Sequence, residues 1–353
     1  MREPTIVQGD DDTHSNGGDV DSSLSIPESE SRRILELRLL ANYCNTVMGD
    51  MQSSPVHHKI YSLALQPDRR HLNFLYAAHA LSATHMVITG TADPEIVEAQ
   101  DIYFGLAIQE QRKETAHLDD HNSVFISFSA MYLMTASFAQ LQNRSLVVPY
   151  AAPREWFEMG RVLQKVYGEI ANPGSPMSPD VAALFNSAPN LVDFDEIFSE
   201  KQSLDEYSHL LTPQYIEGGS DSDAHYDFQQ LYNWNNELSV PELFDAYTGT
   251  LRYIVYLQKA LESKESLHAY YRRLLAFPMI IHEQFSVLLQ QGRVRALIIL
   301  AYFFALVSKA QEIWLVGDMG VRELRAMQES IPLPWQKYLR KPFSIANLVL
   351  PSA

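Results

Sequence analysis

Cysteine is almost absent from this sequence, since Cys44 is the only one among 353 residues. One thiol cannot close a disulfide within the chain, and it cannot supply the ligands of a cysteine-rich zinc or iron–sulfur site. This scarcity is typical of reducing compartments such as the cytosol and nucleus. Basic residues are also few, with 27 against 43 acidic residues and a net charge of −16. That balance argues against a free-standing nucleic-acid-binding surface.

Long apolar runs are missing as well. The N-terminal residues 1–21 contain no apolar segment of the kind found in secretory signals. The longest apolar run, ALIILAYFFALV at 296–307, lies between Arg295 and Lys309. A bilayer span needs about 20 such residues. The run therefore predicts a buried core helix, and we expect no membrane span.

Apolar residues are nevertheless plentiful, at 46% of the chain, so a large core is expected. The charge is concentrated in two segments, 1–31 with a net of −7 and 191–227 with a net of −9, which together carry the whole excess. The composition predicts a disordered acidic leader at 1–31 and a helical domain at 32–343. An acidic insertion at about 191–227 interrupts that domain, and a C-terminal tail occupies 344–353.

The apolar spacing is helical along most of the domain. In the first expected helix, apolar residues recur at intervals of three and four at Ile34, Leu37, Leu40, Ala41, Cys44, Val47 and Met48. No alternating strand pair with a hairpin turn is found. We predict an all-α, irregular multi-helix bundle. The expected helices are 31–48, 56–65, 71–88, 94–115, 123–141, 153–168, 227–234, 240–262, 267–274, 278–291, 294–314, 317–329 and 334–339.

Candidate metal ligands occur in the sequence HLDDH, where His117 and His121 are four residues apart. Asp119 and Asp120 precede an apolar run, however, and aspartates in that position are typical of a helix start. We therefore favour two histidines on different elements and no metal site. The adjacent pair His57-His58 points in two directions on a helix and is interpreted as surface.

Catalytic signatures are lacking. Asp119-Asp120 is the only interior Asp-Asp pair, so the paired metal clusters of an all-α prenyl diphosphate enzyme are not present. There is no nucleophile elbow, phosphate loop or dinucleotide fingerprint. Cys44 lies on the apolar stripe and is expected to be a small buried hydrophobe. We predict no enzyme activity, no catalytic or metal-binding residues and no cofactor; ligand-binding residues cannot be assigned from the sequence.

Basic and aromatic clusters receive structural interpretations. Arg272-Arg273 and the pair Arg293 and Arg295 are expected to be solvated helix ends. Tyr302, Phe303 and Phe304 lie in the apolar run without interleaved basic residues, so we expect them in the core and not in a base-stacking groove.

Two features remain open at this stage. The apolar helix at 296–307 could enclose a cavity for a lipid, although dense packing of its side chains is favoured. The acidic segment 191–227 is either an acidic-hydrophobic activation sequence or an ordinary disordered connection. Its apolar residues are Phe194, Ile197, Phe198, Tyr207, Leu210 and Leu211.

The order of several segments resembles the regulatory region of fungal Zn(II)2Cys6 binuclear-cluster transcription factors, in particular the branch of sterol-uptake-control regulators. The segments are ELRLLANY, HLNFLYAAHALSATH, PREWFEMGRVLQKVYG, the stretch 277–320 and IPLPWQKYLRKPF. They cover roughly 32–343 as loose apolar patterns. The resemblance implies an α-helical effector domain in the nucleus, often dimeric, that senses a sterol, a terpenoid or a protein partner and controls transcription of a metabolic or secondary-metabolite pathway.

The family's DNA-binding module holds two zinc ions with six cysteines, and this chain has one cysteine. We therefore expect no direct DNA binding by this chain, and zinc only in the missing module. Truncation, a mispredicted start and a natural stand-alone domain are the open explanations, and the first residues are similar to family linker. The alternative function is an all-α hydrophobic-ligand-binding or biosynthetic protein, in the cytoplasm, that does not regulate transcription.

Overall fold

The computed structural model describes residues 29–50, 55–64, 71–119, 121–170, 203–213 and 224–350, together with Pro179 and Ala182. All regular secondary structure in these residues is helical, which confirms the all-α, multi-helix expectation. The α-helices are α1 Glu30–Asn42, α2 Met48–Asp50, α3 Pro55–Ala64, α4 Leu72–Ile88, α5 Pro94–Thr115, α6 Ser123–Gln140, α7 Arg154–Ile170, α10 Ala224–Glu237, α11 Pro241–Glu262, α12 Leu267–Ile280, α13 Glu283–Gln290, α14 Val294–Val307, α15 Met319–Ser330, α16 Leu333–Gln336 and α17 Arg340–Ile345. A π-helix, η1 Tyr43–Val47, joins α1 to α2, and 3-10 turns lie at η2 Leu141–Asn143, η3 Asp205–Leu210, η4 Ser308–Ala310 and η5 Lys337–Leu339.

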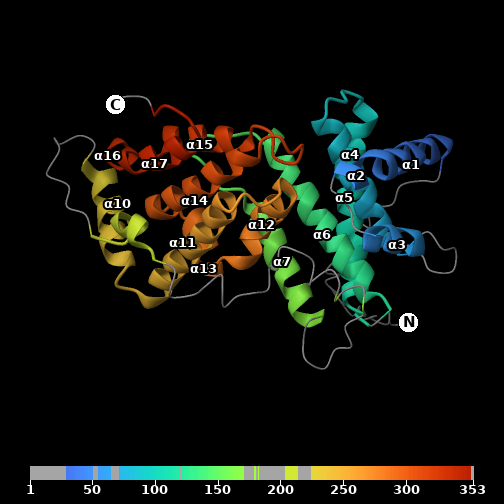
Figure 1. Cartoon of the computed structure of the whole chain (residues 1–353), viewed down its shortest axis with the longest axis horizontal. Helices are drawn as coiled ribbons and strands as arrows, with labels where there is room; N and C mark the ends of the chain where they lie inside the picture. Colours follow the sequence, from blue (N-terminus) through green and yellow to red (C-terminus); the bar gives the residue numbers. More distant parts are fainter. Residues whose placement is uncertain are drawn as a thin grey trace, which may run out of the picture.

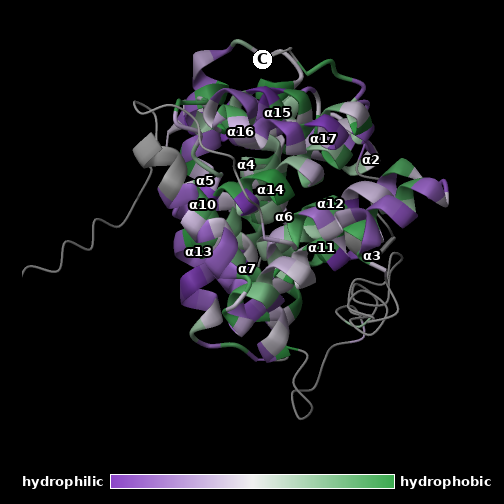
Figure 2. Cartoon of the chain, turned by 90° about the vertical axis from the view of Figure 1, so that its left-hand side faces the viewer, coloured by the Kyte–Doolittle hydropathy of each residue, from purple (hydrophilic) through white to green (hydrophobic). Residues whose placement is uncertain are grey.

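The helices form two groups placed side by side (Figure 1). The N-terminal bundle contains α1 to α6, with α4 packed between α5 and α6. The C-terminal bundle contains α7 and α10 to α17, with α14 in contact with α10, α11, α13, α15 and α17. Hydrophobic residues gather towards the inside of the C-terminal bundle, around α14 (Figure 2).

Helix α6 is shared by the two bundles. Met134 and Phe138 belong to the C-terminal core, whereas Phe128 and Tyr132 belong to the N-terminal core. The helix with its following turn, Ser123–Asn143, is the one candidate in the described residues that is apolar and long enough to span a bilayer. Because 89% of its apolar window is buried inside the fold, it has the character of a core helix. This agrees with the expectation of no membrane span.

Helix α14 is the centre of the C-terminal bundle, as the apolar run predicted. All of its side chains are buried, including Tyr302, Phe303 and Phe304, which confirms their core assignment. Phe303 stacks on Phe277 with ring centroids 3.9 Å apart, and Trp156 lies 5.7 Å from Phe303. These aromatic contacts join α7, α12 and α14.

Most helix starts follow the sequence signals. Asp93 caps α5 by accepting a hydrogen bond from the backbone N–H of Glu95, and Pro94 is the first helical residue. The start predicted at Pro278 is wrong, because Pro278 lies inside α12 near its end. The helix predicted for 294–314 also ends earlier, at Val307. Pro278 is tolerated in the last turn of α12 because it removes one backbone donor there and leaves the preceding turns intact.

The buried face of the first helix differs from the predicted stripe. The predicted stripe is exposed at Ile34 and Leu37 and buried only at its C-terminal end, at Val47 and Met48, whereas the buried residues Leu39 and Tyr43 lie outside the stripe. The inward side of the first two turns carries polar groups instead. The Arg32 Nε donates to the Glu36 Oε1 at 2.9 Å, and Tyr103 of α5 donates to the same oxygen at 2.9 Å. Because polar contacts fill this side, Ile34 and Leu37 in the first half of the stripe face solvent.

Several expectations fall on residues that the structure does not describe. The acidic leader lies outside the described residues except for its last three, where Ser29 caps α1. Most of the acidic segment 191–227 is outside them too. The described residues are 203–213 and 224–227, and in the first of these parts Tyr207 and Leu210 are buried on the C-terminal core, so a disordered connection is wrong for these two residues. In the expected tail, Leu348 and Leu350 pack partly on the same core.

Candidate functional site

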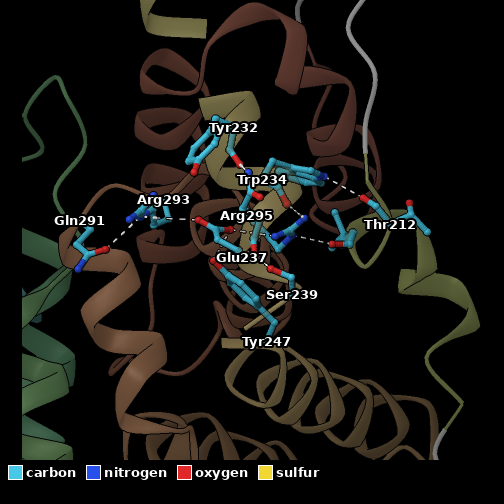
Figure 3. A network of polar contacts seen from close by, with 11 residues as sticks. Thr212, Tyr232, Trp234, Glu237, Ser239, Tyr247, Gln291, Arg293 and Arg295 are labelled. Atoms are coloured by element: carbon cyan, nitrogen blue, oxygen red, sulfur yellow. Dashed lines mark hydrogen bonds and ion pairs between the residues drawn. The ribbon is translucent and has the colours of Figure 1, made fainter. Parts of the chain in front are cut away.

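A buried ion pair is the most unusual polar feature of the C-terminal bundle (Figure 3). Glu237 ends α10 and Arg295 is the second residue of α14. Their residues are 5% and 1% exposed, and the Arg295 Nη1 lies 2.9 Å from the Glu237 Oε2. Two charges removed from water require close partners, since an unpaired buried charge is very costly. The geometry provides those partners on both sides of the pair.

Arg295 donates to three separate segments. Its Nε donates to the Leu210 carbonyl at 2.8 Å, and its Nη2 donates to the Trp234 carbonyl at 2.7 Å. The guanidinium also lies over the Trp234 ring, 4.2 Å from the ring centroid, a cation–π distance. Trp234 in turn donates from its indole to the Thr212 carbonyl at 3.0 Å. Arg295 therefore fixes α10, α14 and the segment 203–213 relative to one another.

Glu237 is surrounded by donors from two other elements. The hydroxyl of Tyr247, on α11, donates to the Glu237 Oε2 at 2.8 Å, and the Arg293 Nε lies 3.7 Å from the Oε1. Burial raises the pKa of the Glu237 carboxyl, and the charges of Arg295 and Arg293 oppose that rise. Burial likewise lowers the pKa of Arg295, opposed by Glu237. Arginine remains protonated at neutral pH even so.

A second buried carboxylate, Glu323 on α15, anchors the connection between α6 and α7. Arg144 donates to both Glu323 oxygens, from Nε at 2.5 Å and from Nη2 at 2.6 Å. Tyr150 donates its hydroxyl to the Oε2 at 2.6 Å. This bidentate geometry is the strong form of an arginine–carboxylate pair. It ties the irregular segment between α6 and α7 to the C-terminal core.

Part of the junction between the two bundles is polar. His85 of α4 is buried, and its Nε2 lies 3.3 Å from the Asp50 carboxylate. A ring nitrogen of His268, on α12, lies 2.9 Å from the carbonyl oxygen of Asp50, and the rings of His85 and Trp314 are nearly perpendicular with centroids 4.7 Å apart. Burial lowers the pKa of His85, and Asp50 opposes this effect. These contacts link residues that are far apart in the sequence.

The HLDDH motif starts a helix, as favoured. Asp119 accepts hydrogen bonds from the backbone N–H groups of His121 and Asn122, and α6 begins at Ser123. These bonds hold the pKa of Asp119 below its usual value. His117 and His121 are exposed in the connection between α5 and α6, not on two different elements. Asp120 lies outside the described residues, and among the described ones no group of three or more His, Cys, Asp or Glu could hold a metal ion.

Two other assignments from the sequence are wrong. Cys44 is exposed, in the π-helix η1, although Val47 and Met48 of the same predicted stripe are buried. Arg295 and Arg273 are buried and not solvated helix ends. Arg273 donates to both oxygens of Glu265, at 2.8 and 2.6 Å, and to the hydroxyl of Tyr256. The side chains of His57 and His58, which were interpreted as surface residues, lie outside the part of the chain that the structure describes.

The chain matches no protein-family model and no curated protein. The fold, the buried charge clusters and the resemblance of the segments are therefore the basis for the functional proposal. Sequence reasoning missed the ion pairs because a lone arginine next to an apolar run has the same pattern as a helix-end arginine. The nearest signal was the position of Arg295 within the first turn of a helix that is otherwise apolar all round.

Proposed function

We propose that this chain is the helical effector domain of a transcription regulator of the fungal zinc-cluster type. In this proposal it acts in the nucleus, through association with itself or with a DNA-bound partner, and it is not an enzyme. The residues of this chain do not supply a binuclear zinc cluster for DNA contact, because one cysteine cannot form it.

The observation that carries the proposal is the position of the segments that bear the family resemblance. They form part of α1, then α4, α7, the run from the end of α12 to the start of α15, and α16 to α17, and outside α1 they supply much of the buried framework. Trp156 and the side chains of α14, for example, belong to these segments and are fully or almost fully buried. Outside α1, the resemblance therefore concerns mainly residues that pack in the core.

The test is a transcription assay with the full chain fused to a heterologous DNA-binding domain. We expect reporter expression in a fungal host to change several-fold relative to the DNA-binding domain alone. The fusion with Glu237→Gln, which removes the partner of buried Arg295, should lose the effect, whereas Glu242→Gln at an exposed position of α11 should keep it. An unchanged reporter at equal protein level would contradict the proposal. Turnover of a prenyl diphosphate by purified protein would contradict it too.

One observation favours the second candidate, a protein that binds a hydrophobic ligand. The indole of Trp156 is buried among Phe138, Phe277 and Phe303, and its N–H donates to no group in the described residues. A ligand oxygen is a suitable acceptor for such a donor. Native mass spectrometry of protein purified from a fungal host tests this candidate. A retained sterol or terpenoid would support it, and protein of bare chain mass would contradict it.

A further inference from the structure

Asp50 connects the two bundles through two different groups. Its carboxylate lies 3.3 Å from the Nε2 of His85, on α4 of the N-terminal bundle. Its backbone carbonyl lies 2.9 Å from the Nε2 of His268, on α12 of the C-terminal bundle. Trp314, between η4 and α15 in the C-terminal bundle, packs against the ring of His85. We call these four residues the junction latch.

The neighbours of His85 on α1 and α4 determine where its ring carries a proton. The Asn42 Nδ2 donates to the backbone carbonyl of Ser82 at 3.2 Å and to the Ser82 hydroxyl at 2.9 Å. Because a carbonyl oxygen can only accept, these bonds fix the orientation of the Asn42 amide. The His85 Nδ1, 3.4 Å from the same Nδ2, therefore faces a donor and has to accept. The proton of the neutral ring lies on Nε2, which donates to Asp50.

A second proton on His85 does not fit this arrangement. It would place an N–H on Nδ1 against the N–H bonds of Asn42, and a turned amide would set its oxygen against the Ser82 carbonyl. Asp50 favours the charged ring, but His85 is only 4% exposed, and burial disfavours a charge. Burial has the larger effect and holds the pKa of His85 below its usual value.

The other surroundings of His85 are uncharged. Among the described residues, the charge that acts on the ring is that of Asp50, from α2. The elements packed on α4, which are α1, η1, α5 and α6, contribute no charge that acts on it. His268 of α12 contacts the carbonyl of Asp50. Trp314 packs on the ring from the C-terminal bundle, so separation at this point would give a charged His85 access to water.

We propose that the junction latch is a pH-sensitive switch, closed while His85 is neutral, and that protonation of His85 releases Trp314 and loosens the contact between the two bundles. Release also hydrates the indole N–H of Trp314, which is buried and has no hydrogen-bond partner in the described part of the chain. Helix α6 completes both cores, so the bundles stay joined when the latch opens.

The size of the effect follows from proton linkage. The open latch binds a proton on His85 more tightly than the closed latch, so acid favours opening. A solvated histidine titrates near pH 6.5, and one proton raises the ratio of open to closed molecules by at most about tenfold for each pH unit below that value. The switch is independent of the proposed function, because its tests use no reporter gene.

The first experiment follows the fluorescence of Trp314 in the full chain, as the difference between the wild type and Trp314→Phe, from about pH 7.5 to about pH 5. We expect the Trp314 emission to move to longer wavelength as the pH falls, because the released indole is hydrated. His85→Gln cannot take up the proton but can still donate to Asp50, so its emission should not move. His117→Gln removes an exposed histidine outside the latch and should behave like the wild type.

Far-ultraviolet dichroism over the same pH range separates release of the latch from unfolding of the helices, and we expect the dichroism to stay constant. A Trp314 emission that does not move in the wild type, or that moves equally in His85→Gln, would overturn the proposal. A change of emission that occurs only together with loss of dichroism would overturn it too.

Two further variants are expected to act with opposite signs. Asp50→Asn still accepts from the Nε2 of His85 but removes the charge that favours the protonated ring, so the emission change should move to higher pH. Asn42→Ala removes the donor that opposes a proton on Nδ1, so the emission change should move to lower pH. Movement in the same direction in both variants would contradict the hydrogen-bond arrangement on which the switch depends.

Discussion

Arg295 and Glu237 place opposite charges where water does not reach, and the surrounding contacts decide whether that is tolerable. The pair replaces hydration with two backbone carbonyls, a tyrosine hydroxyl and the Trp234 ring. Such a pair adds little net stability compared with apolar residues of the same size. It does specify one register of α10 against α14, because any slip leaves a buried charge without a partner.

The residue-scale prediction is that Glu237→Gln destabilises the fold by about 3 to 5 kcal/mol, because the Arg295 charge remains buried and loses its counter-charge. Urea unfolding gives the free energy of unfolding. Glu242→Gln, at an exposed site on α11, should change that energy by less than about 0.5 kcal/mol.

A double variant separates the pair from its members. Glu237→Gln/Arg295→Met removes both charges and should cost less than the sum of the two single changes. Strictly additive losses would show that the two residues do not act as a pair.

His79 gives a second prediction at this scale. It is 9% exposed, its Nδ1 has no hydrogen-bond partner among the described residues, and burial lowers its pKa to about 4. The unfolded chain therefore binds a proton on this residue at a higher pH than the folded chain, and stability falls as pH decreases through this range. Between about pH 7 and pH 5 the loss should be about 2 kcal/mol.

The measurement is urea unfolding of the wild type and of His79→Leu at both pH values. Between pH 7 and pH 5, the His79→Leu variant should lose about 2 kcal/mol less stability than the wild type. An equal loss in both proteins would show that another group causes the pH dependence.

At the scale of the element, α7 packs closely on α12. A Cβ at Gly160 would lie 2.6 Å from the Pro278 Cβ and 2.8 Å from its backbone carbon, whereas a Cβ at Gly168 meets nothing within 4 Å. We predict that Gly160→Ala destabilises by about 1 to 3 kcal/mol through overpacking. Gly168→Ala should stabilise by about 0.5 to 1 kcal/mol through helix propensity. Thermal unfolding of both variants tests the opposite signs; a stabilised Gly160→Ala would contradict the close packing.

Helix starts were predictable from the sequence, and helix faces less so. Asp93-Pro94 and Asp119 are local signals, because the cap and the N–H groups it satisfies lie within a few residues. The face of α1 depends on distant residues instead. Glu36 turns inward because Tyr103, 67 positions away, donates to it, and periodicity along one helix carries no such information. The helix start predicted at Pro278 was wrong for a related reason, since a proline can occupy either the first turn of a helix or its last turn.

For the whole molecule, the shared helix α6 makes the two bundles depend on each other. Its residues complete both cores, so loss of either bundle exposes one of its faces. All four tryptophans, Trp156, Trp234, Trp314 and Trp335, follow α6 in the sequence, whereas the far-ultraviolet dichroism reports helices of both bundles. We predict that tryptophan fluorescence and dichroism give coincident thermal transitions. A dichroism change at a separate temperature would show independent unfolding.

The candidate site was not predictable to the same degree as the fold. The apolar run of α14 predicted a buried helix, because burial of such a run follows from its composition alone. The partners of Arg295 come from segments 58 to 85 residues away, and their meeting depends on how the helices pack. Tyr207 and Leu210 were likewise assigned to an acidic connection because charge dominates their neighbourhood. Their burial becomes apparent only once α11 and α14 are in place.

The side-chain contacts that hold 203–213 in place also indicate where the chain can be cut without loss of the fold. Leu210 and Thr212 give their carbonyls to Arg295 and Trp234, and Tyr207 donates its hydroxyl to Gln258 at 3.0 Å. This segment is therefore held by side chains as well as by peptide bonds. The polypeptide could be divided between α7 and Ser203 into two complementing fragments, and the second fragment would carry its own anchor into the assembled protein.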